Sequence, residues 1–467
     1  MSFFDAFLIR EKLEELLKKK GLRLHFVGIL GAGMLPLSKL ASSFGYKITG
    51  SDARAHTSRE LVDRITKDYG FRITPHRRGL LCGVDLVVTS FAIPDDSPEL
   101  VDAKILGVPI TTRAELLGVL MKRYKKRIGI CGSHGKSTTT ALVDKMLCAG
   151  GFSPTTVSGA TLFDGSDLRI GEEDIFIYEA CEYRDAFLSF HPTHQIITGI
   201  ELDHTDYFPD LASIRHSFLR AANRAQELVV MNSDFESSSS FSRELEAPFV
   251  TYGKATNAIY RYVIKEMNSD SCRFYIYKYG ALLLETETKL FGEYNIANIT
   301  AAAALSDTLG IPKDSIALAI RDFCGIERRM SRIGSLFGKS IFYDYAHHPT
   351  EISATVSAVK ERFGTCAVVF IPHTYSRTKS LWNDFIYALR QADFTILMDI
   401  YPARENPVEG ITSENLALSI GGRAVCAKVE EVLDIISGRP ECAVVLMGAG
   451  DMSKVIDTIK KADGFEE

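Results

Sequence analysis

Short apolar runs alternate with amphipathic stretches along most of the chain. In the first third of the chain the apolar runs lie at residues 24–27, 47–52, 85–90 and 108–110. Helix-length segments separate them, and one of these extends to about residue 44. Because parallel strands need such a crossover between them, the spacing predicts a parallel sheet with strand–helix–strand units. A charged stretch at residues 13–20 predicts a surface helix before the first strand.

A second block of the same kind begins at residues 128–130. A helix is predicted over 137–149, ended by Gly150-Gly151 in a left-handed turn, and another over 298–309, stopped by Gly310-Ile311-Pro312. Apolar strands are predicted at 175–178, 195–200 and 228–231. Residues 260–284 alternate in the manner of hairpin strands, and the serine run 237–240 is interpreted as a loop.

The parallel alternation returns after Gly325 and predicts a third unit. Its strands are expected at residues 340–343, 367–371, 395–398 and 443–447. The basic run at 122–127 is interpreted as a linker. The chain is therefore predicted to be an α/β protein with domains at residues 1–122, 123–325 and 326–467.

The composition limits the number of domains and the classes of binding partner, but it does not indicate a specific function. The 467 residues correspond to about three domains at ~150 residues each. Lys and Arg number 54 against 59 Asp and Glu, so no general attraction to nucleic acid or to anionic membranes is expected. The nine cysteines contain no C-x-x-C pair, which favours a reducing cytosol. Neither a signal peptide at the N-terminus nor a membrane span is expected, so we predict a cytoplasmic protein.

The first glycine cluster spans residues 28–34, between a predicted strand and a predicted helix. Backbone N–H groups and the helix dipole could hold a phosphate there, and Asp52 ends the next strand where dinucleotide folds place a ribose-binding acid. The order of glycines is G-x-x-G-x-G rather than G-x-G-x-x-G. This order disfavours a nicotinamide site, while binding of a nucleotide diphosphate or a tight turn without a ligand stays open.

The second glycine cluster gives a stronger signal. Residues 129–139 read Gly-Ile-Cys-Gly-Ser-His-Gly-Lys-Ser-Thr-Thr, between a strand and a helix. Glycines let the backbone curl around phosphates, Lys136 can neutralise the β- and γ-phosphates, and the Ser137 hydroxyl can reach Mg²⁺. The loop is shorter than the general pattern, because Gly132 stands three residues before Gly135.

Polar groups follow several predicted strands. Glu179 and Glu182 come after one strand, and 203–206 (Asp-His-Thr-Asp) after the next. Since the carboxyl ends of parallel strands form the ligand crevice, these oxygens suit Mg²⁺ beside a nucleotide, and His204 adds a nitrogen ligand.

Two further polar segments follow strands of the third unit. His347-His348 lacks a third zinc ligand at zinc-site spacing, so a polar substrate pocket is favoured over a zinc site. Arg328-Arg329 lies at the second domain boundary, and residues 372–379 follow the strand 367–371. Their positive groups could clamp a carboxylate or a phosphate, or form ordinary surface charge.

Taken together, these motifs resemble those of the Mur ligase family of bacterial cell-wall synthesis. The matching segments are residues 28–34, 50–52, 90–93, 113–115, 132–140, 179–188, 203–208, 295–298, 344–352, 372–379, 399–401 and 448–451. The resemblance implies an N-terminal Rossmann-like domain for a UDP-sugar, a central P-loop ATPase domain with a parallel sheet, and a C-terminal Rossmann-like domain. It is closest to members that join L-alanine to UDP-N-acetylmuramate through an acyl phosphate, with ATP as co-substrate, Mg²⁺ as cofactor and a monomer or weak homodimer as the assembly.

The resemblance also implies roles for individual residues. Catalysis would involve His134, Lys136, Glu179 and His204, with metal ligands Ser137, Glu179 and His204. ATP would contact Gly132, Ser133, Gly135, Lys136, Ser137, Thr138, Asn295, Asn298, Arg329 and Asp344. The UDP-sugar would contact Gly31, Ala32, Gly33, Asp52 and Ser90, and the amino acid Tyr345, His348 and Arg377. Relative to the family pattern, Gly199 replaces an Asn, Ser137 a Thr, Leu35 a Ser and Pro75 a Gly.

Three alternatives remain at this point. A ligase of the same family could attach a whole peptide to UDP-N-acetylmuramate during cell-wall recycling. A non-catalytic UDP-sugar sensor could keep the fold, although the intact Lys136, Glu179 and His204 argue against it. A nicotinamide dehydrogenase would leave the second glycine cluster unexplained.

Overall fold

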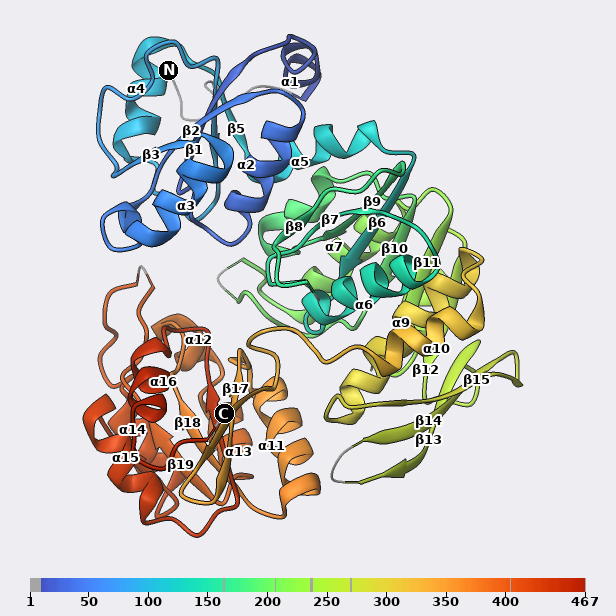
Figure 1. Cartoon of the computed structure of the whole chain (residues 1–467), viewed down its shortest axis with the longest axis vertical. Coiled ribbons are helices and arrows are strands. Elements are labelled where there is room, and N and C mark those ends of the chain that lie inside the picture. The colour runs from blue at the N-terminus through green and yellow to red at the C-terminus, as the bar shows by residue number, and fades with distance from the viewer. Residues whose placement is uncertain are drawn as a thin grey trace.

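The computed structural model describes residues 10–466, apart from 163, 206, 236–237, 269–270 and 404. Residues 1–9, on which the expectation about the N-terminus rests, lie outside this part, as do Asp206 and Ser237. The strands of the described part form sheets of five, ten and six strands. Figure 1 shows them as three units, with the first blue at the top, the second green at the right and the third orange to red at the lower left.

The first sheet has the order β3-β2-β1-β4-β5, and every pairing in it is parallel. Its strands are β1 (Arg23–Val27), β2 (Lys47–Ser51), β3 (Arg72–Thr74), β4 (Leu86–Thr89) and β5 (Ile110–Thr112). Its helices are α1 (Arg10–Leu16), α2 (Met34–Ser43), α3 (Arg59–Tyr69), α4 (Pro98–Leu106) and α5 (Arg113–Leu120). The strand order reverses beside β1, so a crevice is expected at the carboxyl ends of β1 and β4, next to the first glycine cluster.

The second sheet has the order β15-β14-β13-β12-β11-β10-β6-β9-β7-β8. Its strands are β6 (Lys126–Cys131), β7 (Thr155–Val157), β8 (Leu168–Arg169), β9 (Ile175–Glu179), β10 (His194–Ile197), β11 (Leu228–Asn232), β12 (Phe249–Gly253), β13 (Tyr260–Met267), β14 (Cys272–Lys278) and β15 (Ala281–Thr288). Its helices are α6 (Lys136–Ala149), α7 (Leu211–Ala222), α8 (Ser238–Glu244), α9 (Glu293–Thr308) and α10 (Lys313–Arg321). β6 pairs in parallel with β9 and β10, which places the acidic strand ends on both sides of the phosphate loop. The predicted hairpin strands are confirmed as the antiparallel set β13–β15.

Several local predictions are wrong, and tertiary contacts explain three of them. The basic run at 122–127 is not a linker, because a 3₁₀ helix occupies Met121–Arg123 and Lys126 already pairs with Ile175 in the sheet. The described serines of the run 237–240 begin α8, whose Phe241 is fully buried in the core. β10 ends at Ile197, since the following residues turn to contact the phosphate loop. The first helix ends at Leu16, and α9 begins five residues before its predicted start.

The third sheet has the order β16-β17-β21-β18-β19-β20. Its strands are β16 (Ser331–Leu336), β17 (Lys339–Asp344), β18 (Cys366–Phe370), β19 (Phe394–Leu397), β20 (Ala424–Cys426) and β21 (Ala443–Met447). Its helices are α11 (Pro349–Phe363), α12 (Tyr375–Ser380), α13 (Trp382–Leu389), α14 (Ser413–Ile420), α15 (Val429–Ser437) and α16 (Ser453–Lys460). The two central strands, β18 and β21, are buried along their whole length, because helices cover both faces of the sheet.

The three sheets agree with an α/β protein built from three units, while the domain limits 1–122, 123–325 and 326–467 stay predictions. Within the described ranges, no helix is both long and apolar enough to cross a membrane.

Candidate active site

The phosphate loop connects the buried end of β6 to the first turn of α6. Gly132 has φ +139° and Gly135 has φ +80°, both in the range that favours glycine. A Cβ on Gly132 would overlap the Thr198 hydroxyl, and one on Gly135 would lie 2.5 Å from Asn298 Oδ1. The segment after β10 also contacts Ser133, whose backbone N–H donates to Gly199 O at 3.0 Å. The glycines therefore allow a close approach of backbone segments that no larger residue would permit.

Lys136 is the central cation of this loop. Its Nζ donates to Gly132 O at 2.6 Å and forms an ion pair with Glu182, whose carboxylate lies 3.1 Å away and is almost fully buried. Burial alone would lower the pKa of Lys136, but the Glu182 carboxylate raises it overall. Glu182 thus keeps the ammonium charged and curled toward the loop. The sequence identified Glu182 as an acid at a strand end, but not as the partner of Lys136.

The predicted metal ligands lie around the same loop. Ser137 is buried in the first turn of α6. Glu179 ends β9, and its Oε1 accepts hydrogen bonds from Ser158 Oγ at 2.7 Å and Gly159 N at 3.0 Å. His204 has its Nε2 3.6 Å from Glu182 Oε1 and its ring 4.7 Å from that of Tyr183. A hydroxyl and a carboxylate are hard oxygen donors, so Ser137 and Glu179 fit the chemistry that Mg²⁺ requires.

A cavity of about 380 Å³ opens between the second and third units. Six of the predicted ATP residues line it, namely Gly135, Thr138, Asn295, Asn298, Arg329 and Asp344. Burial raises the pKa of Asp344 to about 6, although Arg329 opposes the rise. Asp344 is tied to Ala346 N at 2.9 Å and to Thr355 Oγ1 at 3.1 Å. The cavity has the dimensions of a small-molecule site at a domain junction.

The predicted amino-acid residues lie on the third unit, and one of them reaches the second. Arg377 Nη2 forms an ion pair with Asp203 Oδ1 at 3.1 Å, and both side chains are mostly buried. Although burial would raise it, the pKa of Asp203 is lowered by Arg377 and by His204. Tyr345 lies under the Arg329 guanidinium at 5.0 Å. The structure therefore places Arg377 beside the segment that carries His204.

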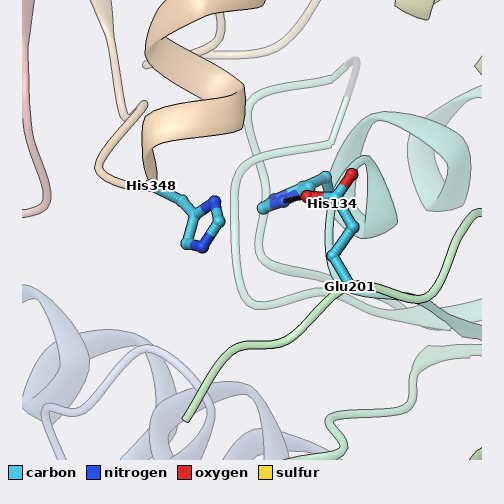
Figure 2. Close-up of side chains that lie close together, drawn as sticks. All are labelled: His134, Glu201 and His348. Carbon is cyan, nitrogen blue, oxygen red and sulfur yellow. Dashed lines mark ion pairs between the residues drawn. The ribbon is translucent and has the colours of Figure 1, made fainter. Parts of the chain in front are cut away.

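His134 of the phosphate loop forms a cluster with Glu201 and His348 (Figure 2). His348 is the N-cap residue of α11, and Figure 2 shows its ring facing His134, with 5.1 Å between the ring centroids. The ligand atoms of the three residues lie within 4.8 Å of one another, as in metal sites. However, Glu351 and Glu201 raise the pKa of His134 to about 10 against the effect of burial, so a metal would have to displace a tightly held proton. A charged imidazolium between two carboxylates accounts better for the geometry.

The predicted UDP-sugar residues gather at the first glycine cluster. Gly31, Ala32 and Gly33 form the turn between β1 and α2, and Ser90 follows β4 at the neighbouring strand end. Asp52 does not present a free carboxylate, because its Oδ2 accepts from Leu30 N at 2.9 Å and its Oδ1 from Arg54 N at 2.9 Å. Asp52 therefore stabilises the turn itself.

Other residues of this region had no predicted role. The Arg113 side chain lies against Gly33, where a Cβ would be 3.1 Å from its Nη1, and Arg54 Nη2 donates to Leu30 O at 2.6 Å. Two arginines thus adjoin the turn. Arg113 lies in the segment 113–115 that resembles the family, whereas the sequence pattern gave no signal for Arg54. Glu351 is a third such residue, although its place three positions after His348 is that of a capping-box acid.

Comparison with known proteins covers almost the whole chain. Three family models match it: "Mur ligase family, catalytic domain" at residues 23–125, "Mur ligase middle domain" at 130–306 and "Mur ligase, glutamate ligase domain" at 328–450.

Individual proteins agree with the family models. The UDP-N-acetylmuramate–L-alanine ligase of Agathobacter rectalis is 35% identical over 95% of this chain and 98% of its own length. That of Geotalea uraniireducens is 37% identical over 94% and 97%. Among solved structures, the UDP-N-acetylmuramate-alanine ligase of Thermotoga maritima has a TM-score of 0.79 at 27% identity, covering 94% of this chain and 98% of its own. A murein peptide ligase of Psychrobacter arcticus, at 20% identity and a TM-score of 0.69 over 94% and 98%, shares the fold. The phosphate loop, the strand-end acids and the three-unit fold thus occur together in a chain that belongs to the Mur ligase family.

Proposed function

We propose that the protein joins L-alanine to the lactyl carboxylate of UDP-N-acetylmuramate, with ATP as the energy source. The products would be ADP, phosphate and UDP-N-acetylmuramoyl-L-alanine, an intermediate of peptidoglycan synthesis. The observation that supports this most is the junction where the Lys136 loop, the cavity and Arg377 come together from two units. The names of relatives at 35–37% identity support the choice of substrates.

The chemistry needs positioning and charge neutralisation. A carboxylate oxygen of the sugar attacks the γ-phosphorus, the bond to ADP breaks, and an acyl phosphate forms. The alanine amine then attacks the acyl carbon, phosphate leaves, and the amine loses a proton as the amide forms. Two anions must meet in the first step, so a cation fixed beside them lowers the barrier.

Residues of this chain supply those charges. Lys136 and the loop N–H groups would bind the β- and γ-phosphates, and Asn295, Asn298, Arg329 and Asp344 would hold the rest of ATP in the cavity. Ser137 and Glu179 would hold one Mg²⁺, and His204 a second one near the acyl phosphate. Mg²⁺ supplies Lewis-acid stabilisation of phosphoryl charge when bound. His134 would face the muramyl carboxylate.

A cytoplasmic location and a monomer or weak homodimer stay predictions.

The identity of the amine substrate is tested by phosphate release. With ATP and UDP-N-acetylmuramate present, we expect L-alanine to stimulate release at least about tenfold more than the tripeptide used in recycling. Selective stimulation by the tripeptide would favour the peptide ligase, and no release with either would favour a sensor. Glycine and serine serve as matched controls for side-chain selectivity.

Arg377 is expected to recognise the alanine carboxylate. Replacing it with methionine keeps an unbranched apolar side chain but removes the guanidinium. The KM for alanine should rise by about 10²-fold, since charged hydrogen bonds contribute about 1.5–3 kcal/mol, while the KM for ATP changes little. Steady-state kinetics with each substrate varied in turn measure the difference. A rise confined to the KM for ATP would assign Arg377 to the nucleotide instead.

A further inference from the structure

Glu351 connects two parts of the site that belong to different units. It lies in the first turn of α11, and its Oε1 is 3.0 Å from Nδ1 of His134 on the phosphate loop. Its Oε2 accepts from the backbone N–H groups of His347 at 3.0 Å and His348 at 3.3 Å. One mostly buried carboxylate therefore binds the phosphate loop with one oxygen and the amino-acid segment with the other.

The charges around His134 explain what this contact does. Glu351 lies on the Nδ1 side and Glu201, from the loop after β10, has its Oε2 3.4 Å from Nε2. The His348 ring lies beside them, and burial together with His134 lowers the pKa of His348. Lys136, on the same loop as His134, is already paired with Glu182. His134 is thus the positive partner of two carboxylates, while His348 is held neutral.

We propose that Glu351 is a positioning residue that holds His134 as an imidazolium beside the reacting carboxylate and fixes the 347–348 backbone of the amino-acid site. The inference rests on the proposed function. The contact with His134 joins the second and third units, whereas the contacts with the 347–348 backbone lie within the third unit. The cation is therefore brought against the amino-acid segment only when these units meet. Arrival of the third unit would thereby complete the charge needed for attack on ATP and place it next to the segment that receives the amine.

The variant Glu351→Gln removes the negative charge of the side chain but keeps its size and shape. Glutamine is the other residue that serves at this position of a capping box, so α11 should still form. If its amide oxygen accepts from the 347–348 backbone, its NH₂ faces His134 Nδ1 and favours the neutral ring. The pKa of His134 should then fall, and activity should be lost as the pH rises through the new value.

The measurement is kcat as a function of pH for wild type and Glu351→Gln. We expect the ratio of wild-type to variant kcat to grow from about 3 at pH 6 to about 10² at pH 8.5. The higher value is typical of the rate loss when a preorganised charge beside the reacting groups is removed. Deprotonation of the alanine amine affects both proteins equally, so it cancels in the ratio. Glu351→Asp, which keeps the carboxylate, should recover most of the activity at pH 8.5.

Glu201→Gln is the matched control. It removes the other carboxylate next to His134, but Glu201 is 41% exposed and is not among the acceptors of the 347–348 N–H groups. It should therefore give a smaller pH-dependent loss and an unchanged KM for alanine. Glu351→Ala, in contrast, should add a rise of about tenfold in that KM.

Two results would overturn the inference. One is a loss of activity in Glu351→Gln that is the same at every pH, and the other is an unchanged KM for alanine in Glu351→Ala with a normal thermal melt. If the wild type released no alanine-dependent phosphate, the proposed function would fail instead, and the two failures are thus distinguishable.

Discussion

Replacing Lys136 with alanine is expected to lower kcat by at least about 10³-fold and to leave UDP-sugar binding intact. The ammonium is held 2.6 Å from the Gly132 carbonyl, at the centre of the loop that would enclose the phosphates. Removing a preorganised charge of this kind costs about 10²–10³ in rate, and here ATP binding is weakened as well. The UDP-sugar residues lie on another sheet, so their affinity should not change.

Because Lys136 forms an ion pair with Glu182, the Lys136→Ala experiment needs a control for lost stability. Alanine at 136 leaves a buried carboxylate without its partner, which can destabilise a protein by about 3–5 kcal/mol. The double variant Lys136→Met/Glu182→Gln removes both charges and should regain thermal stability but not turnover. Phosphate release, calorimetric titration with UDP-N-acetylmuramate and thermal melts measure the three quantities. Turnover equal to wild type in either variant would refute the role of Lys136.

Gly135→Ala is expected to reduce ATP affinity by about 10²-fold or more. A methyl group there would lie 2.5 Å from Asn298 Oδ1, at a residue whose φ is +80°. Either the phosphate loop or Asn298 has to move, and both belong to the predicted ATP site. The left-handed conformation itself costs about 1–2 kcal/mol for a residue with a side chain.

Gly151→Ala is a control for this strain, just after the opposite end of the same helix. Its φ is +87°, but no atom lies within 4 Å of the added Cβ. Both variants should lose thermal stability through the strained backbone, Gly135→Ala at least as much as Gly151→Ala, and only Gly135→Ala should lose ATP affinity, measured by calorimetry with a nonhydrolysable ATP analogue. Equal ATP affinity in the two variants would show that the close approach to Asn298 is not needed for binding.

Local sequence signals predicted the parts of the site that are continuous in the chain. The glycines and Lys136 follow a strand and open a helix, and the structure has this arrangement at Lys126–Cys131 and Lys136–Ala149. The hairpin strands after residue 260 were also predictable, because alternation of polar and apolar residues marks a sheet with one face covered.

Contacts between distant residues were not predictable in this way. His134 and Glu351 are 217 positions apart, and Arg377 and Asp203 are 174 apart, so no local pattern relates them. The same limit applies to Ser238–Glu244, where burial of Phe241 decides in favour of a helix within a serine-rich sequence. At Asp52 the local pattern was misleading. Its position at a strand end suggested a contact with a ligand, but its carboxylate oxygens accept hydrogen bonds from the backbone N–H groups of Leu30 and Arg54.

In the proposed reaction, the muramyl carboxylate is activated by phosphorylation next to Lys136 before alanine attacks. The most direct test of this step uses UDP-N-acetylmuramate labelled with ¹⁸O in the lactyl carboxylate, together with ATP and L-alanine. We expect each phosphate released during amide formation to carry an ¹⁸O atom from that carboxylate, as seen by mass spectrometry. Amide formation accompanied by unlabelled phosphate would contradict it.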